Sequence, residues 1–179
     1  IAKAFQNACE NSKLQDPTED EMLEAPDKIE DSSLLELYNP ELEKLVVEEL
    51  SEFGLLIEDT IKSADERVVS IPYLGVSKGC SESLLLSCKG VSNSQKSNEV
   101  SAWCGPLLQD KDSRKSGMHY LQRRVLDQEE LKKIGIYAVK KAADMLNASP
   151  ISGCKLPVIL DEYVAPRLLG MFFGSFSAE

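Results

Sequence analysis

The chain has 179 residues, of which 42% are hydrophobic and 28% charged, so collagen-like and wholly disordered classes are excluded and a sizeable core is expected. Its formal net charge is −10, and the acidity is concentrated in residues 1–66, which carry 5 basic and 19 acidic side chains. An acidic chain without aromatics interleaved among basic residues is not expected to bind nucleic acid.

Residues 1–37 are predicted to form the tail of a helix followed by an acidic connector. Apolar side chains recur at helical spacing over residues 1–10, and the polar, proline-containing stretch from Glu10 to about Leu37 follows. An acidic run of this kind predicts a solvated surface and no catalytic carboxylates. The chain lacks an initiator methionine, and we interpret it as a piece of a longer polypeptide.

A long helix is predicted next. Asn39 is a favourable N-cap, Pro40 suits the first helical position, and apolar residues recur at helical spacing to about Ser63. This pattern predicts one helix with a single buried stripe.

The character of the sequence then changes to short β-prone runs separated by glycine, serine and asparagine. The predicted strands are Val68–Tyr73, Glu82–Lys89, Asn98–Cys104 and Gly117–Val125. Turns are expected near Gly79, in Gly90–Ser94 and in Gln109–Lys115. Runs without intervening helices favour an antiparallel meander.

A second helix is predicted after Asp127, with Glu130 in a pattern like a capping box, and Leu156–Leu160 is predicted to be a short buried strand. The order helix, strands, helix, strand, helix predicts an α+β fold over residues 38–179, an antiparallel sheet meander with packed helices.

A third helix is predicted from about Asp161. Gly170, Gly174 and Ala178 lie at four-residue spacing, which would allow close packing within the domain or against a second subunit. The apolar stretch from Ile159 to Ala178 is interrupted by Asp161, Glu162 and Arg167, so neither a membrane span nor a membrane partner is expected.

The single histidine and the five cysteines of this chain support few catalytic mechanisms. His119 is the single histidine, too few for a catalytic zinc centre within this chain, and no phosphate-binding glycine loop is present. A cysteine nucleophile paired with His119 has no local signature in its favour. The odd number of cysteines without a CxxC pair indicates reduced thiols of a cytoplasmic protein: Cys9, Cys80, Cys88, Cys104 and Cys154.

The C-terminal part carries the most specific pattern of the chain. Residues 152–161 read SGCKLPVILD, and Leu168-Leu169 follows. This order of glycine, short Pro-Val strand and helix ending in a Leu-Leu pair resembles the TldD/PmbA metallopeptidase family, whose members are also described as proposed modulators of DNA gyrase. The likeness runs from about Tyr38 to Glu179. It is supported by Ala64–Val68, Ser87–Gly90, Ser116-Gly117 and the helix that contains Gly135 and Ala142-Ala143.

The resemblance also implies one of two family branches. In the TldD branch the Leu-Leu pair leads into HExxxH, in which the histidines bind the metal and the glutamate is the general base. Here the corresponding positions read Gly170, Met171, Phe172, Phe173, Gly174 and Ser175. Because the ligand and base positions are replaced, the chain is similar to the PmbA, or TldE-like, branch.

This branch implies a non-catalytic subunit and a fragment of a larger two-domain protein. No catalytic or metal-binding residue and no cofactor is expected in this chain, and zinc is expected in a TldD-type partner subunit. Residues 170–175 are the candidates for facing the partner or the cleft. The implied complex, a heterodimer or a product of self-association, is cytoplasmic and cleaves peptides in peptide maturation and proteolysis.

Two alternatives remain open at this point. The chain could itself belong to a metallopeptidase whose ligands lie in a C-terminal region beyond these residues. It could instead be a regulatory protein that binds DNA gyrase.

Overall fold

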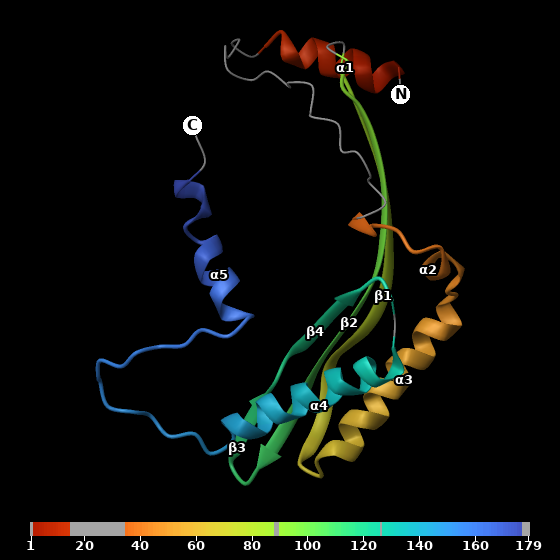
Figure 1. Ribbon diagram of the computed structural model, residues 1–179. Helices are drawn as coiled ribbons and strands as arrows, with labels where there is room; N and C mark the ends of the chain where they lie inside the picture. The colour runs from red at the N-terminus through yellow and green to blue at the C-terminus, as the bar shows by residue number, and fades with distance from the viewer. Residues whose placement is uncertain (1, 15–34, 88–89, 126, 177–179) are drawn as a thin grey trace. The chain divides into compact units, whose positions relative to one another are not determined.

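The computed structural model describes residues 2–14, 35–87, 90–125 and 127–176 (Figure 1). The chain divides into two units, Ile1–Asn147 and Ala148–Glu179, and each is described by itself. Most of the predicted acidic connector falls on residues 15–34, outside the described residues, and a domain boundary after residue 37 stays a prediction. Among the described helices, none combines the length and apolarity that a bilayer span needs.

The first unit contains helix α1 (Ala2–Ser12), whose residues are all exposed, and then a helical segment in two pieces. The Asn39 side chain accepts a hydrogen bond from the Glu41 N–H at 3.0 Å and caps α2 (Pro40–Lys44), as predicted. The prediction of a single long helix is wrong, because α2 ends at Lys44 and a second helix, α3 (Val47–Ala64), begins three residues later. At the break Lys78 Nζ donates to the carbonyl oxygens of Glu43 in α2 and of its C-cap Leu45, and Glu49 accepts from the Val46 N–H at 2.9 Å.

The sheet is antiparallel, as predicted, and over the described residues has four strands, but Val68–Tyr73 and most of Glu82–Lys89, predicted as two strands, belong to one long strand. Strands β1 (Val68–Leu86) and β2 (Ser92–Asp110) form one long hairpin, while β3 (Ser113–Ser116) and β4 (His119–Arg123) pair with β2 on its other side. Gly79 therefore lies inside a strand and not at a turn. The first turn follows Leu86, and the predicted turn in Gln109–Lys115 is confirmed between β2 and β3.

Helices α3 and α4 (Gln128–Met145) cover one face of the sheet and enclose the core. Asp127 caps α4, as predicted, by accepting from the Glu129 N–H at 3.0 Å. The buried members of this core come from α3, β2, α4 and the C-cap of α4: Ile57, Ile61, Ala102, Cys104, Leu108, Leu131, Ile134, Ala138, Val139, Ala142 and Leu146. The core thus lies at the lower half of the hairpin in Figure 1.

Gly117 lets α4 approach the sheet closely. A Cβ atom built on this glycine would lie 2.1 Å from the Ala138 carbonyl oxygen and 2.5 Å from the Ala142 nitrogen. Both neighbours are helix backbone, which cannot turn aside as a side chain can. The Ser116-Gly117 pair of the family resemblance therefore has a packing reason.

The second unit, Ala148–Glu179, differs from two predictions. Leu156–Leu160 forms no strand, and within this unit no strand is present to share its hydrogen bonds among the described residues. The third helix is short: α5 spans Val164–Gly170, and a 3₁₀ turn, η2, spans Phe173–Ser175. Within this unit no residue of either element is buried, so no packing inside the unit offsets the helix-weakening glycines.

Candidate functional site

The six predicted site residues lie at the end of α5 and in η2. Gly170 is the last residue of the helix, Met171 is its C-cap, and the Met171 and Phe172 N–H groups donate to carbonyls three residues earlier, at 3.2 and 2.9 Å. A Cβ atom on Gly170 or Gly174 would meet no described atom within 4 Å. Within the described residues of the second unit, the close helix packing predicted from the glycine spacing is therefore absent.

These positions do not fit a zinc site. Zinc in proteins is held by thiolate, imidazole or carboxylate groups, whereas the positions that correspond to HExxxH offer glycine, a thioether and a serine hydroxyl. Within the described ranges, no three His, Cys, Asp or Glu side chains are grouped so as to hold a metal ion.

His119 lies opposite Cys104 in the sheet, but the Cys104 thiol is not activated as a nucleophile. His119 of β4 and Cys104 of β2 are register partners, and the imidazole packs on the Tyr137 ring with centroids 5.3 Å apart. The Cys104 thiol is fully buried and donates to the Ile134 carbonyl at 3.6 Å. Burial raises the pKa of Cys104 to about 12, whereas a nucleophilic thiol needs a lowered pKa.

Cys104 is accordingly expected to resist alkylation in the folded protein at pH 8, while exposed Cys9, Cys80 and Cys154 react. Since the thiol keeps its proton to about pH 12 when folded but ionises near its ordinary pKa when unfolded, it lowers stability as the pH rises through that window. Mass spectrometry after iodoacetamide treatment, with a sample in urea as control, measures the protection. Rapid labelling of Cys104 without denaturant would contradict this prediction.

A polar network, which the sequence reading missed, ties residues 37–45 across the hairpin; we call this segment the strap. Asn98 on β2 is 4% exposed, and its side chain accepts from the Asn39 N–H at 2.8 Å and donates to the Asn39 carbonyl at 2.7 Å. The Asn98 N–H donates to the Leu37 carbonyl at 3.1 Å, and Arg124 Nε donates to that same oxygen at 3.2 Å. These bonds hold the entrance to α2 against β2.

Charged groups fasten the other end of the strap. Lys96 Nζ lies 2.7 Å from a Glu43 carboxylate oxygen, 3.1 Å from the Tyr38 hydroxyl and 4.2 Å from the centre of the Tyr38 ring. The hydrogen bond from Lys96 holds the pKa of Glu43 below its ordinary value, and Glu43 in turn raises the pKa of Lys96. The asparagines at 39 and 98, far apart in sequence, carried no signal that they would pair.

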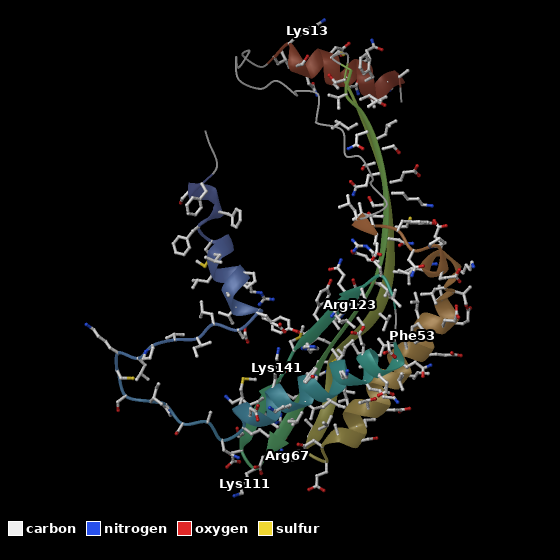
Figure 2. All side chains as sticks on the ribbon, in the orientation of Figure 1. Lys13, Phe53, Arg67, Lys111, Arg123 and Lys141 are labelled. Atoms are coloured by element: carbon white, nitrogen blue, oxygen red, sulfur yellow. The ribbon has the colours of Figure 1, made fainter. Side chains whose placement is uncertain are left out.

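Two hollows flank the strap. The larger, about 470 Å³, is lined by Leu35, Glu36, Glu99, Gln122, Arg123 and Arg124. The smaller, about 200 Å³, shares Glu99 and Arg124 with it and includes Cys80. Figure 2 shows Arg123 at the end of β4, where the sheet narrows to the hairpin. Because both charge signs line these open hollows, they suit a polar chain segment better than a single ion.

The sheet face turned away from α3 and α4 is aromatic and open. Tyr73, Trp103 and Tyr120 stand on neighbouring strands, because Trp103 pairs with Gly75 on β1 and with Tyr120 on β4. The indole lies over Gly75, where a Cβ would come within 2.3 Å of it, and Tyr73 and Tyr120 are 62% and 46% exposed. This face could contact a partner, and only the register between strands brings the three rings together.

The comparison with family models assigns the class of protein. The model for the PmbA/TldA metallopeptidase central domain matches residues 40–146, which run from the start of α2 to the end of α4. The chain therefore belongs to the PmbA/TldD metallopeptidase family. No curated protein matches it.

Two solved structures share the fold. One is a proposed modulator of a DNA gyrase, TM0727 from Thermotoga maritima, with a TM-score of 0.68, 21% identity, and coverage of 84% of this chain and 33% of that one. The other is TldE from Thermococcus kodakarensis, with a TM-score of 0.61, 20% identity, and coverage of 79% and 31%. This chain thus spans about a third of the length of these relatives.

Proposed function

We propose that this chain is part of the metal-motif-lacking subunit of a TldD/PmbA-type metallopeptidase, a cytoplasmic complex active in peptide maturation and proteolysis. The observation that carries the proposal is the replacement of HExxxH by Gly170–Ser175 in a chain whose residues 40–146 match the family's central domain. A chain without ligands or general base cannot by itself activate a water molecule as zinc does. Its contribution is then structural: a wall of the cleft and a surface for a TldD-type subunit that carries the zinc.

Two surfaces suit this role. The exposed Phe172, Phe173 and Phe176 and the open aromatic face of the sheet present apolar area of the kind found at protein interfaces. The name TldE of one similar structure supports the assignment to the partner branch.

The test is co-expression of the full-length protein with the TldD-type subunit of the same organism. We expect the pair to co-purify, to contain zinc and to cleave an unstructured peptide, whereas this protein alone does none of these. A second pair, in which the HExxxH glutamate of the partner is replaced by glutamine, should keep the complex and lose the cleavage.

Other outcomes identify the alternatives. Stoichiometric zinc and peptidase activity in the singly expressed full-length protein would show that it is itself a peptidase, and would overturn the proposal. Co-purification with DNA gyrase, without any TldD-type subunit, would favour the regulatory protein.

A further inference from the structure

The open face of the sheet, which is turned away from α3 and α4, has an aromatic end and a polar end. The even-numbered side chains of β2 from position 98 to position 104 are buried, so the odd-numbered Glu99, Ser101 and Trp103 lie on the open face. Cross-strand partners share a face, so Gln122 and Tyr120 of β4 stand beside Ser101 and Trp103. The aromatic end therefore runs through Ser101 and Gln122 into the larger of the two hollows, which Glu99 and Gln122 help to line.

The aromatic end presents a ring that lies against the sheet. A Cβ atom on Gly75 would lie 2.3 Å from an indole carbon of Trp103, so the glycine lets the ring lie across β1. On the other side of Trp103, the Tyr120 hydroxyl donates to the Gln122 side-chain oxygen at 2.7 Å and lies 3.4 Å from the Ser101 hydroxyl. Such rings stack well on proline and on other aromatic side chains, so this end suits a residue of that kind in an extended peptide.

At the polar end Arg124 is held in place by the strap. Its Nε donates to the Leu37 carbonyl at 3.2 Å, and its own carbonyl accepts from the Asn39 side chain at 2.6 Å. The two terminal nitrogens of the guanidinium have no partner among the described residues, and a guanidinium binds a carboxylate through paired hydrogen bonds. Because the Gln122 oxygen already accepts from Tyr120, the N–H groups of its amide remain as further donors in this hollow. The polar end can therefore receive a carboxylate.

Two carboxylates in the same hollow narrow the choice of ligand. Glu36 and Glu99 line it, and neither has a hydrogen bond or an ion pair with a described residue. They would repel a free phosphate ion or a strongly acidic segment, and would attract a cationic group next to a bound carboxylate. Charge complementarity therefore favours a polypeptide with an acidic and a basic residue side by side.

We propose that the open face binds an extended segment of a polypeptide substrate, with an aromatic or proline residue on Trp103 and an acidic residue on Arg124. Glu99 in the hollow lies four residues from Trp103 along β2, which corresponds to about 14 Å. An extended peptide covers this distance in about four residues. The acidic residue is thus about four positions from the aromatic one, and the lysine or arginine next to it lies near Glu99.

This inference rests on the proposed function in taking a polypeptide as the ligand. It assigns the open face to the wall of the cleft and leaves the exposed phenylalanines of the second unit as the surface for the TldD-type subunit. The residues that carry it lie between Glu36 and Arg124 in the first unit. Peptide binding can therefore be measured on this chain without zinc and without the partner.

The test is the fluorescence anisotropy of a labelled peptide of about ten residues, titrated with the 179-residue chain. The peptide consists of glycine and serine, with tryptophan at its third position, glutamate at its seventh and lysine at its eighth. We expect saturable binding. Replacing the glutamate by glutamine, or the tryptophan by serine, should weaken binding about tenfold, because each change removes one strong contact. These changes are in the peptide and leave the protein fold untouched.

Variants of the protein show which residues make these contacts. Arg124→Gln should weaken binding of the glutamate peptide about tenfold but leave the glutamine peptide as it was, because both changes remove the same contact. Trp103→Leu should act in the same way on the tryptophan and serine peptides. Arg114→Gln is the matched control, since this exposed arginine of β3 lies outside the hollow, and it should leave binding unchanged. Comparing two peptides on one variant separates a lost contact from a general effect on folding.

Three results would overturn the proposal. The first is the absence of saturable binding, and the second is an equal loss for the glutamate and glutamine peptides in Arg124→Gln. The third is displacement of the peptide by inorganic phosphate at the concentration of peptide that displaces it, which would show a simple anion site. None of these results affects co-purification with a TldD-type subunit, so the proposed function is tested separately.

Discussion

Replacing Gly117 by alanine is expected to lower the free energy of unfolding by about 3 kcal/mol, the upper part of the range for overpacking. The added Cβ would lie 2.1 Å from the Ala138 carbonyl oxygen, so α4 must move away from the sheet. That movement would loosen the contacts of Ile134 and Ala138 in the core. Urea unfolding followed by circular dichroism measures the change.

Gly54→Ala is the matched control for this substitution. Gly54 lies inside α3, and a Cβ there would meet no described atom within 4 Å, so the higher helix propensity of alanine should stabilise by about 1 kcal/mol. Equal unfolding midpoints for Gly117→Ala and the unmodified chain would show that α4 does not lie as close to the sheet as described here.

Asn98→Asp is expected to destabilise the protein by about 3 kcal/mol at pH 7, because it places a carboxylate among buried groups. One aspartate oxygen can still accept from the Asn39 N–H, but the other faces the Asn39 carbonyl, to which the asparagine donates at 2.7 Å. Burial and this carbonyl should raise the pKa of the new carboxyl in the folded protein. Its protonated form restores the lost donor.

The sign of the pH dependence follows from that raised pKa. The loss in free energy of unfolding relative to the unmodified chain should be smallest below about pH 3.9, the pKa of an aspartate in the unfolded chain. It should grow as the pH rises through the higher pKa of the new carboxyl in the folded protein. Asn98→Ala lacks a titratable group and should show a deficit without this pH dependence. Asn93→Asp, an exposed position on the same strand, should change stability little at any pH. A pH-independent deficit for Asn98→Asp would contradict the role of Asn98 in fastening the strap.

The match to the family's central domain begins within the strap. The family match begins at Pro40, directly after Asn39, which caps α2 and pairs with Asn98.

At the C-terminal end of α3, Asp65 accepts two hydrogen bonds from the Arg67 side chain, at 2.9 and 2.7 Å, and these bonds lower the pKa of the Asp65 carboxyl. This pair lies within the Ala64–Val68 match of the family resemblance and fixes the passage from α3 into β1.

The local features of the fold could be read from the sequence because they depend on neighbours in the chain. Asn39 and Asp127 cap helices through N–H groups two residues away, and α4 shows its apolar stripe in a single stretch. The α+β class followed from the order of these elements. The family followed from the motifs at residues 152–169 and from the replaced positions 170–175, which need no tertiary contact to be read.

Tertiary structure alone decided the features that depend on distant residues. Lys78 of β1 donates hydrogen bonds to the carbonyl oxygens of Glu43 and Leu45 at the end of α2, where the helix that periodicity predicts to be continuous is interrupted. A glycine such as Gly79 has a weak strand propensity and is typical of a turn. The sixteen paired positions between β1 and β2 outweigh this propensity and keep Gly79 inside β1. Leu156–Leu160 has the composition of a strand, but hydrogen bonds between strands need a neighbour, and the described residues of its own unit contain no other strand.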